Sequence, residues 1–271
     1  MPELLKNIEV KIEMILAPLE QFKVLSLYSL ILLNLDLSLT NALVLALLLS
    51  ILFFSFSVVL KKHNVQLKSF NCYYFFPTAG QSFVEFLNKF ISELVKSSLN
   101  KRGELFYPFI SSLFVLVLFC NLIGLIPYSF TLTSHLIITF LLSFSVFIGV
   151  NIVGFEKHSL AMASLIIPAN TSVVLAVVLV PIEFVSYVVK PVSLGVRLFI
   201  NLMAGHTLLK VIFGFSWGLA LMDNFLFFSL HLVPLFLLIL LMGLELGVAL
   251  IQAYVFTILI CIYLNDSINL H

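Results

Sequence analysis

Long apolar runs separated by short polar breaks cover most of the chain. A helix needs about 20 apolar residues to cross the hydrocarbon core of a bilayer. We predict a first membrane helix over residues 28–60, whose uninterrupted part is Thr40–Leu60. We also predict a helical pair over residues 105–153, built from Leu105–Ile126 and Leu132–Val153. The pattern therefore indicates several membrane helices joined by short loops.

Two longer apolar segments follow, at residues 160–213 and 225–264, and we expect them to form a long hairpin. As a helix, the continuous part Ile182–Phe213 would measure roughly 45 Å, well beyond a hydrocarbon core of about 30 Å. Such a length demands tilt, a kink or two separate spans. Pro191 and Pro234 are the predicted kink points. Polar residues and a proline interrupt residues 160–180, so the path of that stretch stays open.

Two segments have a different pattern. Within Gln81–Leu99, apolar residues recur at helical i, i+3 and i+4 spacing while lysines and glutamates fill the other positions. This pattern predicts an amphipathic helix lying on the membrane surface or against a partner. Residues 1–27 carry mixed charge and are expected to form an N-terminal surface segment without a secretory signal.

Composition supports the membrane assignment. The chain of 271 residues is 62% hydrophobic and 10% charged, with a mean hydropathy of +1.19, whereas soluble domains carry about 25% charged residues. We predict an all-α polytopic membrane protein of about five or six membrane helices, plus the amphipathic helix. A net charge of +1 gives no reason to expect nucleic acid. The three cysteines have no metal-ligand spacing, and we expect neither a metal nor a cofactor.

One charged face lies in the first long segment. Arg197 lies inside strongly apolar sequence, where a charge costs roughly 2.5–3.5 kcal/mol on insertion scales. Glu183, Lys190 and Arg197 are spaced seven residues apart, which returns to nearly the same face of a helix. A helix with charges on one face and apolar residues elsewhere favours an ion pathway.

The second long segment carries a matching set. Glu245 and Gln252 are seven residues apart and share a face. If the two segments pack antiparallel, His206 and Glu245 share one membrane side, and Glu183 and Asp266 share the other. Two polar pockets at opposite surfaces would then flank Arg197, which is the geometry of two offset half-channels.

A moving partner that carries a carboxylate would fit this arrangement. The carboxylate would take a proton from one pocket and release it into the other. A nearby fixed arginine favours the ionised carboxylate, and arginine itself does not release its proton.

Six motifs, taken together, resemble subunit a of the F-type ATP synthase in its mitochondrial form. The resemblance covers almost the whole chain. The motifs are APLEQF at Ala17–Phe22, CNLIGLIPYSFTLTSH at Cys120–His135, GFEKHS at Gly154–Ser159, PIEFVSYVVKPVSLGVRLFINLMAGHTLL at Pro181–Leu209, ELGVALIQAYVFTIL at Glu245–Leu259, and YLNDSINLH at Tyr263–His271.

The resemblance implies roles for matching positions. Arg197 would be the essential arginine that faces the c-ring carboxylate. His206 and Glu245 would line the intermembrane-space half-channel. The remaining polar positions would complete the two paths, with Asn201 and Gln252 near the arginine on the intermembrane-space side and Glu183, Tyr187 and Asp266 on the matrix side.

The resemblance also implies partners and location. The partners would be the c-ring, subunit b with the peripheral stalk, other ATP synthase subunits and the lipid bilayer. The location would be the mitochondrial inner membrane, and the chain would be a non-catalytic proton-channel subunit without a nucleotide site.

Three positions depart from the family pattern. Lys190 replaces a usual arginine, Ser159 replaces a glycine, and Ile200 replaces a common alanine. The role of Lys190 stays open.

Alternative readings of the sequence remain. A secondary transporter or channel with its own substrate site would show internal repeats and paired broken helices, and we find none. A purely structural membrane subunit would not need charges at lipid depth. Arg197 could also form a structural ion pair with Glu183 or Glu245.

Overall fold

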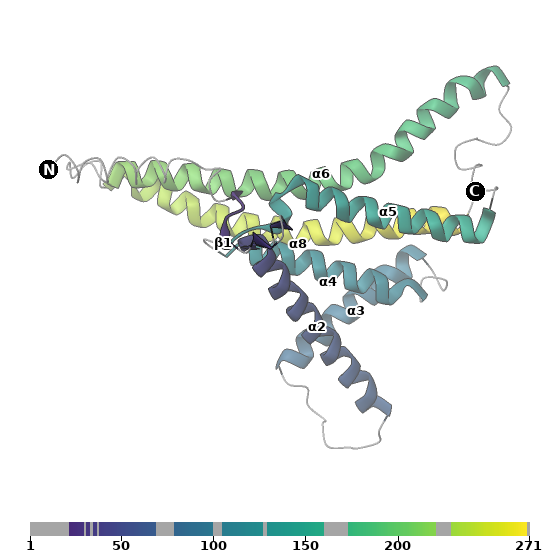
Figure 1. Cartoon of the computed structure of the whole chain (residues 1–271), viewed down its shortest axis with the longest axis horizontal. Helices are drawn as coiled ribbons and strands as arrows, with labels where there is room; N and C mark the ends of the chain where they lie inside the picture. Colours follow the sequence, from purple (N-terminus) through teal and green to yellow (C-terminus); the bar gives the residue numbers. More distant parts are fainter. Residues whose placement is uncertain are drawn as a thin grey trace. The chain divides into compact units, whose positions relative to one another are not determined.

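Helices make up nearly all of the described chain. The computed structural model describes residues 22–29, 31–32, 35–36, 38–68, 79–99, 105–126, 129–159, 173–220 and 229–269. Its elements (Figure 1) are the helices α2 (Asn41–Lys68), α3 (Ala79–Leu99), α4 (Tyr107–Gly124), α5 (Leu136–His158), α6 (Val173–Ala220) and α8 (Leu232–Ile268), with a 3-10 turn η3 at Leu132–Ser134. The predicted surface segment at residues 1–27 lies mostly outside the described residues.

Four of these helices are long and apolar enough to cross a membrane. They are α4, α5, residues Leu175–Ala220 of α6, and α8. Many large apolar side chains on them are exposed, as lipid contact requires, among them Ile137, Val177 and Ile239. The chain is therefore an all-α polytopic membrane protein, as the sequence predicted.

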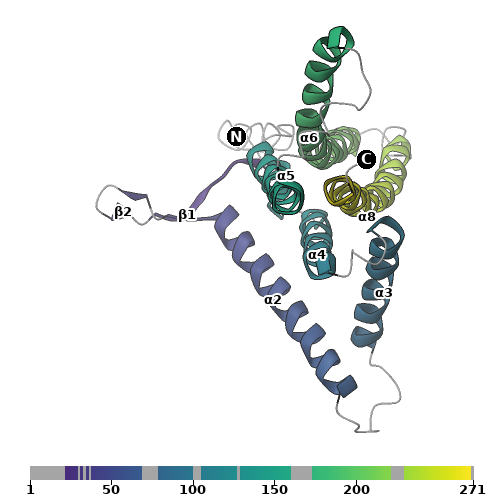
Figure 2. The ribbon, with the colours of Figure 1, turned by 90° about the vertical axis from the view of Figure 1, so that its right-hand side faces the viewer.

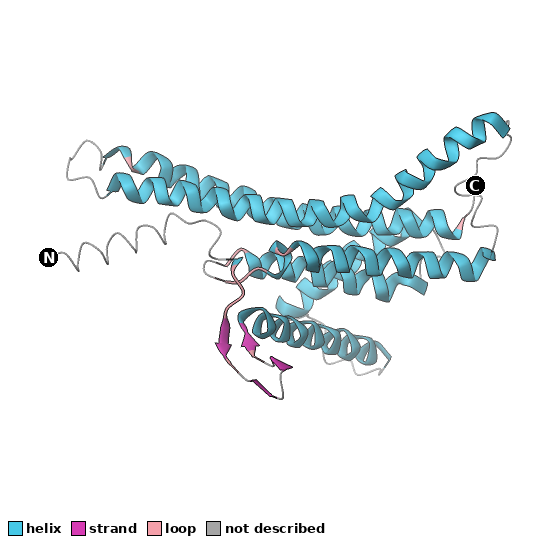
Figure 3. Cartoon of the chain, turned by 45° about the horizontal axis from the view of Figure 1, so that its top comes forward, coloured by secondary structure: helices cyan, strands magenta, loops and turns pink. Residues whose placement is uncertain are grey.

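The start of the first predicted membrane helix is wrong. Residues 26–40 contain two short antiparallel pairs, β1 (Ser26–Tyr28) with β4 (Leu39–Thr40) and β2 (Ile31–Leu32) with β3 (Leu35–Asp36), shown in magenta in Figure 3. Asn34 and Asp36 interrupt the apolar run here, and asparagine and aspartate favour turns over helix.

Helix α2 begins where a cap becomes available. The Leu43 amide donates to the Thr40 hydroxyl at 3.3 Å, which satisfies one of the amides left over at a helix N-terminus. The Leu25 amide donates to Asn41 Oδ1 at 3.2 Å and ties the start of α2 to the residue before β1. The apolar part of α2 in the described residues is Asn41–Ser55, shorter than a bilayer span, so a first membrane helix stays a prediction.

The end of the third predicted span is also wrong. Helix α5 does not end at Val153 but continues through charged sequence to His158. Charged residues mark the end of the apolar run, but they can continue the same helix where it reaches water. Ser159 then adopts a positive φ of 50°, the left-handed conformation that ends many helices and favours glycine. His158 Nε2 lies 2.9 Å from the carbonyl oxygen of Ile268 and anchors this end.

Both long helices continue past their predicted C-terminal ends, α6 to Ala220 instead of residue 213 and α8 to Ile268 instead of residue 264. Helix α6 has 48 residues and continues through both Pro181 and Pro191. Residues 229–230 are helical, His231 forms a turn, and α8 begins at Leu232. Pro234 therefore lies in the first turn of α8, where a missing amide hydrogen costs no helical bond, and a kink at Pro234 stays a prediction. The undescribed residues include 160–172 and 221–228, and the open path of 160–180 falls largely there.

The chain divides into two compact units. The first unit comprises Met1–Leu45, Cys120–Thr139 and Val196–Gln252, and the second comprises Ala46–Phe119, Phe140–Gly195 and Ala253–His271. Helices α6 and α8 each contribute one part to both units.

The second unit has an apolar core. Within it, α4, α5 and the last part of α8 lie side by side (Figures 1 and 2). The apolar face of α3 packs inward, since the Phe90 ring lies 6.0 Å from that of Phe114 on α4 and 5.9 Å from that of Tyr254 on α8. The predicted amphipathic helix is present, with Lys89 and Glu93 exposed on its opposite face. The largest fully buried side chains of this core include Ile91, Val95, Ile110, Val115, Val117, Phe256, Ile260 and Leu264.

The first unit combines apolar and polar burial. Leu198 and Leu202 of α6 and Ala249 of α8 are buried there. Buried polar side chains lie among them, contributed by α4, by the loop before α5, and by α5, α6 and α8 (Asn121, Thr131, Thr133, Ser134, Thr139, Ser216, Glu245 and Gln252).

Candidate functional site

Polar side chains of α6 and α8 meet in the first unit. His206 Nδ1 of α6 lies 3.6 Å from Glu245 Oε1 of α8. The Asn201 side-chain amide donates to Gln252 Oε1 at 2.9 Å. The residue number falls along one helix as it rises along the other, so the two helices run antiparallel in this unit.

The histidine–glutamate pair is almost enclosed. The side chains of His206 and Glu245 are only 15% and 6% exposed. Among the described residues, His206 Nε2 and both carboxylate oxygens of Glu245 have no hydrogen-bond partner. Buried polar atoms in proteins almost always bond to protein or to ordered water. The pair is therefore suited to holding water and exchanging protons with it.

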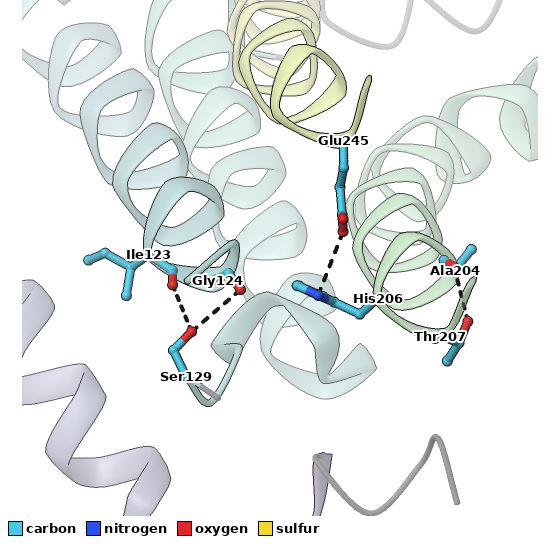
Figure 4. Close-up of polar contacts among 7 residues, drawn as sticks. All are labelled: Ile123, Gly124, Ser129, Ala204, His206, Thr207 and Glu245. Atoms are coloured by element: carbon cyan, nitrogen blue, oxygen red, sulfur yellow. Dashed lines mark hydrogen bonds and ion pairs between the residues drawn. The ribbon is translucent and has the colours of Figure 1, made fainter. Parts of the chain in front are cut away.

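Two glycines, Gly205 and Gly124, let the surrounding backbone approach this pair, and Figure 4 shows the pair with Gly124. A Cβ placed on Gly205 would lie 2.6 Å from Glu245 Oε1, and one placed on Gly124 would lie 3.0 Å from Thr131 Cγ2 and 4.0 Å from His206 Nε2. The loop after α4 is held by the Ser129 hydroxyl, which donates to the Ile123 carbonyl at 2.7 Å. The end of α4 thus forms a wall beside His206.

Sequence reasoning missed the polar residues of this wall. Asn121 Oδ1, Thr131 Oγ1, Thr133 Oγ1 and His135 Nε2 are buried without a hydrogen-bond partner in the part of the chain that the structure describes. The Asn121 side-chain amide donates to the Ala249 carbonyl at 3.3 Å and so reaches α8. All four lie within the motif Cys120–His135, which indicated the family but not that these residues line a site.

His135 connects this wall to an open cleft. It lines a cleft of about 360 Å³ together with Phe22, Lys23, Ser134, Leu136, Phe199 and Met203. Burial lowers the pKa of His135, which favours the neutral imidazole near neutral pH. A neutral imidazole can both accept and donate a proton.

Arg197 faces away from these contacts. It is exposed on α6, followed along the same helix by exposed Ile200, Ala204, Leu208 and Val211. Within the described part of the chain, Arg197 forms no hydrogen bond or ion pair, and Glu245 faces His206 instead. A charge on an apolar membrane helix is costly without a partner, so this face favours contact with an anionic group.

A second polar cluster lies in the second unit. Lys190 Nζ of α6 is 3.8 Å from Asp266 Oδ2 of α8. The Tyr187 hydroxyl donates to Asn151 Oδ1 of α5. Lys190, Asp266 and Tyr187 border a cavity of about 10 Å³ that Phe147, Val150, Tyr263 and Ser267 also line.

The structure therefore groups some of the predicted matrix-side residues and not others. Tyr187 and Asp266 line the same small cavity. Glu183 is exposed on α6 and does not line it. Among the described residues, no group of three or more histidines, cysteines or carboxylates is placed to hold a metal ion.

Comparison with known proteins agrees with the motifs. The sequence pattern of the family described as ATP synthase A chain matches residues 40–265. The chain is 47% identical over 261 residues to ATP synthase subunit a-2 of Arabidopsis thaliana, covering 94% of this chain and 72% of that protein. It is 47% identical over 258 residues to ATP synthase subunit a of Marchantia polymorpha, with 94% and 99% covered. The protein of the same name from Pylaiella littoralis is 49% identical over 255 residues, with 94% and 99% covered.

Proposed function

Since the chain belongs to the ATP synthase A chain family, whose members are the proton-translocating subunit of the Fo sector, we propose that it moves protons through two offset half-channels. One half-channel would bring protons to the carboxylates of a c-ring, and the other would take them away. The observation that carries this proposal is that Arg197 is exposed on an apolar face of α6 and has no ion-pair partner among the described residues.

The first half-channel would run through the first unit on the intermembrane-space side. Water would enter by the cleft at His135 and meet the polar wall of Asn121 and Thr131. The proton would then pass to His206 and Glu245, whose facing atoms are 3.6 Å apart. A side-chain movement of less than about 1 Å would bring these atoms within the roughly 2.6–3.2 Å range of a direct transfer. Asn201 and Gln252 would extend the polar path along the same two helices.

Arg197 would separate the two paths. A guanidinium is a permanent cation in proteins, so Arg197 would attract an ionised ring carboxylate without passing a proton itself. A ring carboxylate that has lost its proton would move past Arg197, and one that carries a proton would turn through the lipid. The exposed face from Arg197 to Val211 is apolar apart from the arginine, which suits a moving helical surface.

The second half-channel would run through the second unit to the matrix. Tyr187 and Asp266 border its small cavity, and Glu183 would lie farther along α6. In this proposal the chain makes no bond to nucleotide and catalyses no reaction. It works in the mitochondrial inner membrane with the c-ring, subunit b of the peripheral stalk and the other ATP synthase subunits.

The test is Arg197→Ala in the assembled ATP synthase, reconstituted in vesicles and energised by a proton gradient. We expect ATP synthesis to be abolished while the amount of assembled complex stays near wild type. The control is Arg102→Ala, which removes the other arginine of the chain from the polar segment Asn100–Glu104, outside the described residues. Surface charges contribute little, so the control should be mild. A wild-type rate in Arg197→Ala would refute the proposal.

A further inference from the structure

The ammonium group of Lys190 is held on three sides. Its Nζ lies 3.8 Å from Asp266 Oδ2, 5.6 Å from the centroid of the Tyr187 ring and 5.3 Å from that of the Tyr263 ring. The two tyrosines come from different helices, α6 and α8. We call this group of four residues the lysine cage.

The rings restrict a side chain that would otherwise move. The side chains of Lys190 and Asp266 are 35% and 43% exposed, and exposed ion pairs are usually loose because two flexible chains must share one geometry. Aromatic faces attract a cation and limit the positions that it can take. The cage therefore fixes the ammonium group, and the ammonium group in turn fixes the carboxylate.

The cage is itself anchored to α5. The Tyr187 hydroxyl donates to Asn151 Oδ1, and the Tyr187 ring lies 5.0 Å from that of Phe147. Pro191 has no amide hydrogen, so the carbonyl of Tyr187 also lacks its helical donor. Three helices thus converge on the side chain that supports Lys190.

The space beside the cage is small. The cavity that Lys190, Tyr187, Tyr263 and Asp266 border has a volume of about 10 Å³, which is close to the minimum that holds one water. A proton that passes through one water needs a donor and an acceptor at about 2.6–3.2 Å. With so little room, the position of the Asp266 carboxylate decides whether that transfer is possible.

We propose that Lys190 is a positioning residue of the matrix-side path, holding the Asp266 carboxylate at the cavity through the aromatic cage. This inference rests on the proposed function, because it assumes that protons leave by this cavity. Lys190 touches neither the ring carboxylate nor Arg197 in this role. It acts only through Asp266.

The experiment is a double-mutant cycle in the reconstituted ATP synthase, with ATP synthesis measured per assembled complex. Lys190→Met removes the charge and keeps the length, and Asp266→Asn removes its partner. We expect each to lower the rate by about five- to tenfold, and the double variant to be no worse than the more damaging single one, because directly interacting residues are not additive. If the loss of rate in the double variant equalled the product of the two single losses, the proposal would be overturned.

Conservative variants separate positioning from simple support. Lys190→Arg should keep at least half of the rate, because a guanidinium also stacks on aromatic faces and pairs with a carboxylate. Tyr263→Phe keeps the ring and should be near wild type, whereas Tyr263→Leu should lose about as much as Lys190→Met. Equal loss in Tyr263→Phe and Tyr263→Leu would contradict the cage.

Lys157→Met is the matched control. Lys157 Nζ also lies over an aromatic ring in the same unit, 5.9 Å from the centroid of Phe106, but it does not line the cavity. Its loss should leave the rate unchanged. If Arg197→Ala abolishes synthesis while Lys190→Met has no effect, this inference fails and the proposed function stands. If Arg197→Ala retains synthesis, the proposed function fails first.

Discussion

The polar sites of the two units differ in the burial and pairing of their carboxylates. In the first unit, Glu245 is almost fully buried and neither of its oxygens has a hydrogen-bond partner among the described residues. In the second unit, Asp266 is nearly half exposed, and its carboxylate pairs with Lys190. One carboxylate is enclosed and unsatisfied, and the other is open and paired.

The surroundings of the two sites differ in the same way. The buried hydroxyls of Ser111, Ser143, Thr257 and Ser267 in the second unit donate to carbonyls of their own helices. The buried, unpartnered polar atoms of the described chain all belong to the first unit. Unsatisfied polar groups are costly in a membrane, so the first site should be far less tolerant of change.

The largest expected difference is between the two carboxylates. Glu245→Gln keeps the shape but removes a proton carrier from an enclosed site, and we expect a loss of roughly 100-fold, the size of a general acid–base contribution. Asp266→Asn lies where water has better access and should cost about tenfold or less. ATP synthesis per assembled complex measures both. Equal losses would erase the distinction between the enclosed site and the open one.

The sidedness of the two sites is the next expectation. After replacement of Cys72, Cys120 and Cys261, cysteines at positions 206 and 245 should react with a thiol reagent only from the intermembrane-space side. Cysteines at 183 and 266 should react only from the matrix side. Labelling of 206 and 266 from the same side would mean one continuous aqueous pore, which would dissipate the gradient without turning a rotor.

A smaller change tests how closely the enclosed site is packed. A Cβ on Gly205 would lie 2.6 Å from Glu245 Oε1, so Gly205→Ala should displace the carboxylate and lower the rate by about tenfold, with little loss of stability because a flexible side chain can move.

The matched control for Gly205 is Gly218→Ala on the same helix. A Cβ there meets nothing within 4 Å, and alanine favours helix over glycine by about 1 kcal/mol. Its synthesis rate should stay at the wild-type value. A wild-type rate in Gly205→Ala as well would show that Glu245 tolerates displacement.

The smallest expected effect is on stability, at the end of α5 in the second unit, away from its cavity. Ser159 adopts a φ of 50°, which costs a residue with a side chain about 1 kcal/mol relative to glycine. Ser159→Gly should therefore raise the thermal stability of the assembled protein slightly and leave synthesis unchanged. A melting temperature below wild type would contradict this account of the helix end.

The sequence determined the helices and misplaced several of their ends. Apolar runs of membrane length are enough to identify α4, α5, α6 and α8, because a helix is the simplest way to satisfy backbone groups in lipid. The strands within residues 26–40 and the extension of α5 to His158 depended on local caps and turns. Hydropathy does not register such hydrogen bonds.

For the polar sites too, the sequence predicted some of the neighbouring residues and the structure decided the others. Helical spacing within one segment put Glu183, Lys190 and Arg197 on one face, and the antiparallel pairing of two segments suggested that His206 meets Glu245. Asn121, Thr131 and His135 came from another part of the chain, and Lys190, not Glu183, proved to be the neighbour of Asp266. Periodicity relates residues on one helix, but only packing between helices decides which side chains from distant segments meet. In lipid this packing is decisive, because a polar group left without a hydrogen-bond partner is costly there.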